Sequence, residues 1–472
     1  MAHCRKSLHQ RWHALLAALL GSVVVLPLFL AGAAQADDIR NKEYWLQDYG
    51  ITEAWKTTKG KGVKVAVIDS GVDGGHPDLK GAVSGGTDVS GAGTANGQRG
   101  LGEVPEHGTL VATLLAGRGH PAPKPSGSPK PSATADKPTP LEKLGAGPDG
   151  IVGVAPEAEL LAVSVWIEGE SSGPNPAGIG IDEQLPNAVR WAVDNGATVI
   201  NMSLGSSSTT WPESWDQAFL YAEQKDVLIV AAAGNRAGGL TQVGAPATIP
   251  GVLSVAGLDR EGKASRESSS EGISIAVAAP SEKLVGGLPE GFYADWSGTS
   301  GAAPLVSGVA ALIRSKYPEL TAAQVANRIV LSARDAGDPG FDTIYGHGIL
   351  DVDAAVNAEL EVPEKSMLGS MAEWIEVYRR GKPDPAPAET EPAPPQETPA
   401  IPAPPVPVAD DGAGESAVLP ATVVLGFAGL LLALVVAGSL HGVRAYRAQA
   451  GEPVEEPTGE SDGPPGEVPQ NS

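Results

Sequence analysis

Short apolar strands alternate with helical segments through most of this 472-residue chain, and this alternation limits its possible folds more than any other feature. Runs of β-branched and small apolar residues are typical of buried strands, and apolar residues spaced three and four apart are typical of helices. Strands that alternate with helices form a largely parallel α/β sheet with helices on its faces. The predicted strands are 63–68, 160–165, 198–202, 227–232 and 252–257, and the predicted helices are 108–115, 185–194, 215–224 and 303–315.

Three short segments carry side chains of the kinds that nucleophilic catalysis needs. Asp69 follows the first predicted strand, His107 opens a helix, and Ser300 lies between two glycines just before another helix. A serine hydroxyl is a poor nucleophile until an imidazole takes its proton, and a carboxylate must hold that imidazole in the right tautomer. The order Asp, His, Ser along the chain is one of the known orders of such a triad. The sequence therefore predicts a catalytic triad that transfers acyl groups.

Each of these residues also has an ordinary structural explanation. Asp69 could belong to a turn, His107 could simply start its helix, and Ser300 could cap the next helix. Asn235, which follows a glycine, could be a turn residue, but its amide could also bind the oxyanion of a tetrahedral intermediate. The ordered set favours catalysis over accidental co-occurrence. A lipase or esterase is disfavoured, because those enzymes need a Gly-x-Ser-x-Gly elbow and the chain order Ser, Asp, His.

At these residues the chain resembles the subtilisin-like serine proteases, the subtilase family (peptidase S8). The resemblance implies a subtilisin-like fold, with a largely parallel central sheet flanked by helices. It also implies that Asp69 orients the imidazole and that His107 is the general base and acid. Ser300 is then the nucleophile, and Asn235 completes the oxyanion hole. The matching segments, in family order between about residues 45 and 357, are Ala66-Val-Ile-Asp-Ser-Gly-Val72, His76-Pro-Asp-Leu79, His107-Gly-Thr109, Val152-Gly-Val-Ala-Pro156, Asn201-Met-Ser-Leu-Gly205, Ala233-Gly-Asn235, and Gly298-Thr-Ser300 with Ala302-Ala-Pro304.

The same resemblance implies where a peptide substrate binds. The segment 203–205 pairs with the extended substrate backbone and so adds a strand to a sheet edge. The side chain before the scissile bond enters a slot lined by small, uncharged residues. Such a slot favours neutral or apolar side chains over Lys or Arg, because an unpaired buried charge is costly. The predicted substrate-binding residues are Ser203, Leu204, Gly205, Ala232, Ala233, Gly234 and Gly244.

Two residues depart from the family pattern beside the predicted triad. Gly301 stands where the family commonly has a larger side chain, often Met or an aromatic residue, and glycine adds backbone freedom there. Glu106 directly precedes His107 and would raise the pKa of that imidazole if it faced it. Three features motivate an alternative function: Gly301, the anchor described below, and the lack of a pro-domain, since only about thirty residues separate Ala36 from the predicted strand before Asp69. In that alternative the chain is a structural scaffold of a secretion complex, with weak or dispensable protease activity.

Two apolar stretches near the ends predict export and membrane anchoring. Residues 1–36 contain basic residues, an apolar run and Ala34-Gln-Ala36, which is typical of a cleaved signal peptide, with a membrane anchor as the alternative. Residues 417–440 contain no charge and are long enough, at ~1.5 Å per residue, to span a bilayer core of ~30 Å. Two arginines follow, which places the tail 441–472 in the cytoplasm. We therefore expect a single C-terminal transmembrane helix in the cell membrane and an extracellular catalytic domain.

The segments between these ends divide the rest of the chain. Residues 37–360 are predicted to form the catalytic domain, with an insertion at 119–150 rich in Pro, Lys, Ser and Gly. We expect a flexible surface loop there, and three roles for it stay open: a gate over the cleft, a cleavage site, or an inert insertion. Residues 361–416 hold a juxtadomain segment and a Pro-rich linker that favours extended polyproline II.

This order of segments resembles one branch of the family, the mycosins, which are membrane-anchored proteases of actinobacterial type VII secretion. The signal peptide, the lack of a pro-domain, the insertion after the histidine helix, the linker and the anchor all match that branch. Its members usually carry disulfides, whereas the single cysteine here, Cys4, lies in the predicted signal peptide. The resemblance implies polypeptide substrates, namely exported proteins, and type VII secretion components as partners.

Charge and ligand patterns exclude other classes. The formal net charge of -23 argues against a nucleic-acid partner, which would call for clustered basic residues. The histidines outside the predicted signal peptide show no paired ligand spacing, so no metal site is predicted. Many subtilases bind structural calcium, but no residue of this chain can be assigned to such a site. We therefore expect no cofactor.

Overall fold

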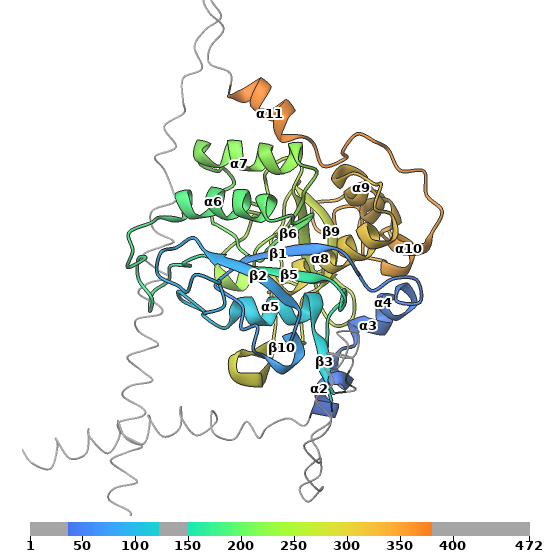
Figure 1. Ribbon diagram of the computed structural model, residues 1–472. Coiled ribbons are helices and arrows are strands. Elements are labelled where there is room, and N and C mark those ends of the chain that lie inside the picture. Colours follow the sequence, from blue (N-terminus) through green and yellow to red (C-terminus); the bar gives the residue numbers. More distant parts are fainter. Residues whose placement is uncertain (1–35, 122–146, 148, 380–472) are drawn as a thin grey trace, which may run out of the picture. The chain divides into compact units, whose positions relative to one another are not determined.

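A seven-stranded parallel sheet forms the centre of the fold (Figure 1). The computed structural model describes residues 36–121, 147 and 149–379. The strand order is β2-β5-β1-β6-β7-β8-β9, and every neighbouring pair runs parallel, which confirms the predicted parallel α/β sheet. The strands are β1 (Lys64–Asp69), β2 (Val83–Asp88), β5 (Glu159–Ser164), β6 (Val199–Met202), β7 (Leu228–Ala232), β8 (Leu253–Leu258) and β9 (Ile275–Pro280).

Both edge strands of this sheet escape prediction from the sequence, whereas the inner strands lie within a residue of their predicted bounds. Strand β2 is half-exposed and holds two adjacent glycines, so it lacks the apolar run that marks a buried strand. Strand β9 is buried but ends at Pro280, a residue that argues against a strand in sequence-based assignment.

Four long helices cover the two faces of the sheet (Figure 1). Helices α6 (Ile181–Asp194) and α7 (Glu213–Gln224) pack on one face, and α5 (His107–Ala116) and α8 (Thr299–Lys316) pack on the other. Every residue of α5 after its first is buried, as expected for a helix that is apolar on all sides. Helix α8 begins four residues earlier than predicted, with Gly298 as its N-cap. Ser300 therefore lies inside the first turn, and the alternative that it caps the helix is wrong.

Further helices complete the domain at its two chain ends. They are α2 (Ala36–Lys42), α3 (Trp45–Asp48), α4 (Ile51–Ala54), α9 (Ala322–Ser332), α10 (Val352–Asn357) and α11 (Met371–Tyr378). The N-terminal helices belong to the same core as the sheet, because Trp45 and Ile51 are buried in it. Helix α11 packs on α7: the rings of Trp211 and Trp374 are 4.6 Å apart, and Arg379 lies 2.7 Å from Asp216.

Two antiparallel hairpins lie outside the main sheet. The first joins β3 (Arg118–His120) to β4 (Asp149–Val152), so the described ends of the predicted insertion 119–150 are strands, not loop. The second joins β10 (Leu284–Leu288) to β11 (Phe292–Trp296) and leads directly into α8.

Several predicted segments lie outside the described residues. They are the signal peptide up to residue 35, the core of the insertion, and the chain from residue 380 onward. Within residues 36–379 as described, no helix is long and apolar enough to cross a membrane.

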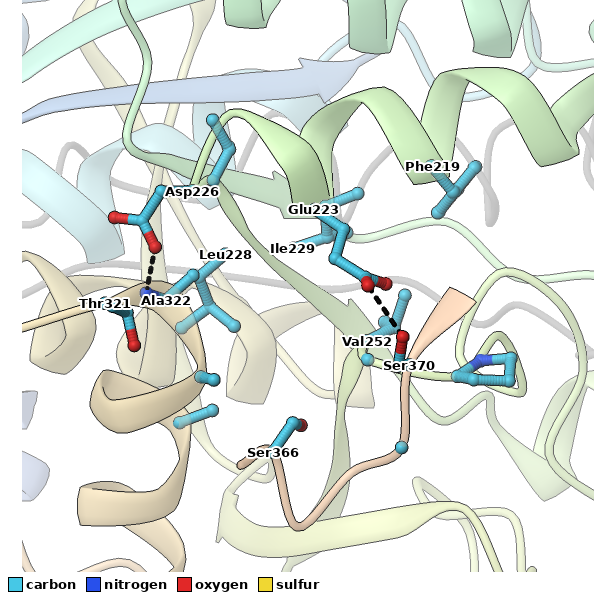
Figure 2. A pocket seen from close by; sticks show the side chains of 16 residues that line it. Phe219, Glu223, Asp226, Leu228, Ile229, Val252, Thr321, Ala322, Ser366 and Ser370 are labelled. Atoms are coloured by element: carbon cyan, nitrogen blue, oxygen red, sulfur yellow. Dashed lines mark hydrogen bonds between the residues drawn. The ribbon is translucent and has the colours of Figure 1, made fainter. Parts of the chain in front are cut away.

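A cavity of about 340 Å³ lies at the N-terminal end of β7, between α7, α9 and the segment 366–370 (Figure 2). Its polar groups are already paired with the protein. The hydroxyl of Ser370 donates to Glu223 at 2.7 Å, and the backbone N–H of Ala322 donates to Asp226 at 2.6 Å. The cavity is therefore not the catalytic site that the sequence predicts, which lies at the other ends of the strands.

Candidate active site

The predicted catalytic residues gather at the C-terminal ends of the strands. Asp69 is the last residue of β1, and Ser203 directly follows β6. Asn235 comes three residues after the end of β7. The register aligns these ends, because Ile68 pairs with Met202 and Met202 pairs with Ala231. Open α/β sheets place their functional residues outside the carboxyl ends of their strands.

Asp69 and His107 form a direct hydrogen bond. Their Oδ1 and Nδ1 atoms are 2.8 Å apart, and the Asp69 side chain is fully buried. The same Oδ1 accepts the backbone N–H of Ser70 at 2.7 Å, while Oδ2 is buried without a partner in the described structure. The hydroxyl of Ser70 accepts the backbone N–H of Gly108 at 3.0 Å, which fixes the start of α5. With Nδ1–H directed at Asp69, the Nε2 atom of His107 is left as the basic nitrogen.

The surroundings of His107 raise its pKa above the ordinary value. Burial acts to lower the pKa, but the charge of Asp69, the hydrogen bond to it and the charge of Glu106 together outweigh burial. Glu106 therefore has the effect expected for an acid that faces the imidazole. The ring of Trp296 packs edge-on against His107, with centroids 5.9 Å apart. These contacts favour the imidazolium form, which a general base must adopt during the reaction.

Ser300 is held beside Ser203 by two hydrogen bonds. The Ser300 hydroxyl donates to the carbonyl of Ser203 at 3.2 Å, and the Ser203 hydroxyl donates to the carbonyl of Ser300 at 2.8 Å. Asp69 and His107 are thus hydrogen-bonded to each other, but no hydrogen bond joins His107 to Ser300 in the described part of the chain. Catalytic hydrogen bonds are often long before substrate binds. Ser300 also lies in the first turn of an 18-residue helix, where the helix dipole favours negative charge.

The amide of Asn235 is oriented by the residues just before Ser300. Its Oδ1 accepts the backbone N–H and the hydroxyl of Thr299, at 2.8 and 2.9 Å. Its Nδ2 makes no hydrogen bond to any described residue, so it is a free donor. A Cβ at Gly298 would lie 3.2 Å from Nδ2, and the φ of +147° there also requires glycine. The free donor therefore stands where an oxyanion on the substrate of Ser300 could be bound.

Three of the predicted substrate-binding glycines lie close together. A Cβ at Gly234 would lie 3.1 Å from Cδ1 of Leu240, and a Cβ at Gly205 would lie 4.0 Å from the same atom. Gly244 packs against the backbone of Ser206, next to Gly205. Leu240 thus stands between two of the predicted walls, although no motif marks it in the sequence. The other predicted members are Ser203 and Leu204 after β6, and Ala232 and Ala233 at the end of β7.

Gly301, the departure from the family pattern, has a packing explanation. A Cβ at this position would overlap Cδ1 of Leu284 and would lie 3.4 Å from the ring of Trp296. The glycine therefore lets α8 lie close to the β10–β11 hairpin. Its presence reflects this close approach and does not by itself indicate a weakened nucleophile.

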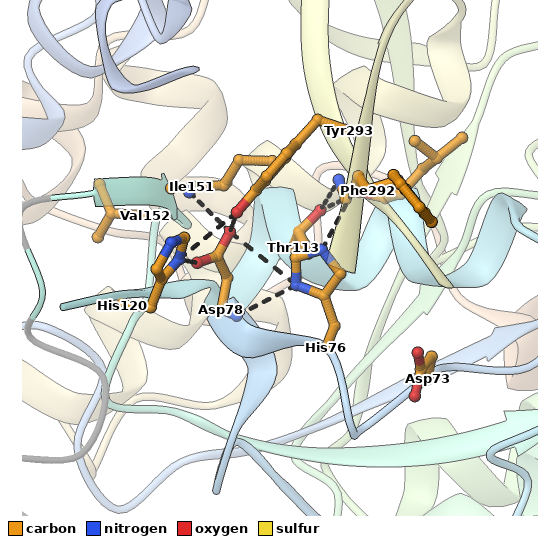
Figure 3. Close-up of polar contacts among 12 residues, drawn as sticks. Asp73, His76, Asp78, Thr113, His120, Ile151, Val152, Phe292 and Tyr293 are labelled. Carbon is orange, nitrogen blue, oxygen red and sulfur yellow. Dashed lines mark hydrogen bonds and ion pairs between the residues drawn. The ribbon is translucent and has the colours of Figure 1, made fainter. Parts of the chain in front are cut away.

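The structure also contains a second histidine–aspartate pair, which the sequence did not predict (Figure 3). His120 Nδ1 is 2.6 Å from Oδ1 of Asp78, whose side chain is fully buried. The hydroxyl of Tyr293 and the backbone N–H of Ile151 both donate to Oδ2, each at 2.8 Å. Both oxygens of Asp78 are thus taken by donors of the protein.

Across the described residues, no group of three or more His, Cys, Asp or Glu side chains is placed to hold a metal ion, and structural calcium stays unassigned.

A buried carboxylate paired with an imidazole, near a serine in the first turn of a helix, is typical of serine hydrolases on an α/β sheet. Similarity to known proteins narrows this class. Residues 60–348 match the subtilase family, and the chain belongs to this family of serine proteases.

Relatives of two kinds share this similarity. Subtilisin DY of Bacillus licheniformis is 35% identical over 301 residues, which cover 63% of this chain and 92% of the relative. Mycosin-1 of Mycobacterium tuberculosis is 34% identical over 366 residues, which cover 67% of this chain and 73% of the relative. The crystal structure of MycP1 from the ESX-1 type VII secretion system matches with a TM-score of 0.52 and 30% identity, over 68% of this chain and 88% of that one. The chain is thus a subtilisin-like serine protease that is similar to mycosins.

Proposed function

We propose that the chain is a serine endopeptidase whose catalytic triad is Asp69, His107 and Ser300. The observation that carries this proposal is the 2.8 Å contact between Asp69 Oδ1 and His107 Nδ1 at the strand ends, taken together with Ser300 in the first turn of the neighbouring helix. This contact leaves Nε2 of His107 without a partner among the described residues. His107 begins helix α5, which packs beside α8, the helix that carries Ser300. Asn235 supplies the oxyanion donor.

The reaction follows from these positions. His107 Nε2 takes the proton of the Ser300 hydroxyl while Oγ bonds to the carbonyl carbon of the scissile peptide bond. The carbonyl oxygen becomes an oxyanion, which the Nδ2 of Asn235 and the N-terminus of α8 stabilise. The C–N bond then breaks, and His107 passes the proton to the leaving amine. Water attacks the acyl-enzyme by the same route and releases the second product.

The substrate-binding residues support a preference for a small, neutral side chain before the scissile bond. The segment 203–205 would pair with the substrate backbone, and the glycines at 205 and 234 would bound the slot. Cδ1 of Leu240 lies near both glycines, and we infer that this side chain limits the length of the substrate side chain that the slot accepts. An apolar slot without a charged lining disfavours Lys and Arg.

The site of action that we propose is the outer face of the cell membrane. The predicted signal peptide and the predicted helix 417–440 support an anchored enzyme with its catalytic domain outside. The similarity to Mycosin-1 supports type VII secretion as the setting and exported proteins as the substrates.

Packing explains one of the three features that favour the scaffold alternative. A Cβ at Gly301 would overlap Cδ1 of Leu284, so this glycine is required by the close approach of α8 to the β10–β11 hairpin. A cell-based test separates the two functions. If the full-length Ser300→Ala chain still assembles with its partners but leaves exported substrates uncleaved, the enzymatic function holds. If exported substrates are still cleaved in the presence of Ser300→Ala, and the complex fails to assemble only when the whole chain is missing, the scaffold function holds.

Turnover of short peptides by the purified full-length chain tests the chemistry directly. We expect cleavage of a chromogenic amide with alanine before the scissile bond, and none with the Ser300→Ala variant. Turnover that survives this substitution would show that another residue is the nucleophile.

A further inference from the structure

Asp78 is a buried junction between three separate parts of the chain (Figure 3). It follows His76 at the start of the short helix η1 (Pro77–Leu79), and its side chain is fully enclosed. One oxygen accepts from His120 on β3, and the other accepts from the backbone of Ile151 on β4 and from Tyr293 on β11. These hydrogen bonds give each carboxylate oxygen at least one donor from the protein.

His76 also binds the β10–β11 hairpin. Its Nδ1 accepts the backbone N–H of Asp78 at 3.1 Å, and its Nε2 donates to the carbonyl of Phe292 at 3.2 Å. Only the neutral Nε2–H tautomer makes both bonds. Burial lowers the pKa of His76 against the raising effect of Asp78, which keeps the imidazole neutral. Neighbouring residues Tyr293 and Phe292 are thus each bound to the His76–Asp78 turn.

The β10–β11 hairpin is also packed closely on the helix that carries His107. The backbone N–H of Gly287 donates to the hydroxyl of Thr113 in α5 at 2.9 Å. A Cβ at Gly287 would lie 2.7 Å from Thr113 and 2.8 Å from His76, so the hairpin has no room to shift toward either. At its tip, the backbone N–H of Glu290 donates to Asp73 at 3.0 Å.

The same hairpin carries groups that the proposed reaction needs. Strand β11 ends at Trp296, whose ring packs against His107, and the chain continues through Ser297 and Gly298 into the turn that holds Ser300. Tyr293 lies on the same short strand as Trp296, three residues before it. A displacement of Tyr293 would therefore move both the Trp296 ring that packs against His107 and the turn that positions Ser300.

We propose that Asp78, His120 and Tyr293 form a positioning cluster that holds the β10–β11 hairpin, and through it Trp296 and Ser300, in the geometry needed for catalysis. This inference rests on the proposed function, because it assigns the cluster an effect on the reaction of Ser300. None of the three belongs to the predicted substrate-binding residues. The cluster acts on the rate of the chemical step and not on substrate affinity. The predicted substrate slot, at Gly205 and Gly234, follows strands β6 and β7 and does not involve the hairpin.

The Tyr293→Phe variant of the full-length chain removes one hydroxyl and keeps the ring. We expect kcat for the peptide substrate to fall about tenfold with KM unchanged within twofold, because small misplacements of reacting groups cost rate steeply. The control is Tyr221→Phe, which removes an exposed bond from a tyrosine hydroxyl to Asp194 at 2.7 Å on the other sheet face. We expect this control to leave kcat unchanged.

A rescue experiment at His120 separates positioning from simple destabilisation. His120→Ala removes the donor to Asp78, and we expect a loss in kcat similar to that of Tyr293→Phe. His120→Asn offers an amide N–H near the place of Nδ1, and we expect it to restore most of the rate. Thermal unfolding of each variant shows whether rate follows stability.

The outcomes distinguish this inference from the function on which it rests. A wild-type chain without peptide turnover would overturn both. An active wild type in which Tyr293→Phe matches Tyr221→Phe in kcat would overturn the positioning cluster alone. The same holds if the variant changes only the unfolding temperature, or if KM and not kcat responds.

Discussion

Two histidine–aspartate pairs lie in one domain, and they differ in how completely their carboxylates are hydrogen-bonded. Asp69 is 2.8 Å from His107, and Asp78 is 2.6 Å from His120, with both carboxylates fully buried. Asp69 keeps one oxygen without a partner in the described structure, whereas both oxygens of Asp78 accept from the protein. A short contact between His and Asp is therefore no sign of catalysis by itself.

From this difference we propose different tasks for the two pairs. A carboxylate whose two oxygens both accept hydrogen bonds holds its neighbours rigidly. Its loss leaves several buried donors without an acceptor. A carboxylate with one imidazole partner beside an unengaged Nε2 can respond when charge moves during a reaction. We expect changes at the first pair to act on rate, and changes at the second to act mainly on stability, with a smaller effect on rate through the hairpin.

The largest effect is expected for Asp69→Asn. Asparagine would favour the wrong imidazole tautomer, so kcat should fall by about 10⁴-fold. Peptide turnover measures this loss, and thermal unfolding should show a folded protein. If the variant kept more than a tenth of the wild-type rate, the catalytic assignment of the first pair would be wrong.

Asn235→Ala sharpens the account of the first site. It removes the free Nδ2 donor while the Asp69–His107 pair stays intact. We expect kcat to fall by about 10²- to 10³-fold, with KM little changed. Steady-state kinetics decides this, and an equal change in KM would indicate a role in substrate binding instead.

Asp78→Ala tests the second pair. The substitution leaves the donors of His120, Ile151 and Tyr293 without their acceptor, so we expect the free energy of unfolding to fall by about 3 kcal/mol or more. Urea unfolding of the variant beside Asp69→Asn gives the comparison directly. Equal stability of the two variants would remove the distinction between the pairs.

Leu240→Ala concerns the slot beside the first pair. Shortening this side chain should raise kcat/KM for substrates with leucine or phenylalanine before the scissile bond, relative to alanine, by about tenfold. Leu331→Ala, at a residue that is 41% exposed on α9, is the control and should leave the preference unchanged. An unchanged ratio in both variants would place the slot elsewhere.

The smallest effect is expected for Glu106→Gln. The charges of Asp69 and Glu106 outweigh burial and raise the pKa of His107 above about 6.5, so activity is lost as pH falls through this raised pKa. Removing the charge of Glu106 lowers the pKa, and the acid limb of the pH–rate profile should move to lower pH. A limb that stays in place, or moves up, would show that Glu106 does not act on His107.

Much of this organisation can be predicted from the sequence. The inner strands and the Asp69–His107 contact follow from local pattern and motif, because the reaction itself demands those residue types in that order. The bond between Asp78 and His120 joins residues 42 positions apart, and no motif demands it. Leu240 and the contact of Gly301 with Leu284 are likewise decided by packing between distant segments. Prediction therefore succeeds where chemistry fixes the residue and fails where only the folded neighbours do.

The most direct test of the central claim is labelling of the full-length chain with a fluorophosphonate probe, with the adduct mapped to a residue. The probe reacts with a serine whose hydroxyl a neighbouring base activates. We predict an adduct on Ser300 that disappears in Ser300→Ala, is strongly slowed in Asp69→Asn, and persists in Tyr221→Phe. A folded wild-type chain that takes no label, or takes it on another serine, would contradict the claim that the first pair activates Ser300.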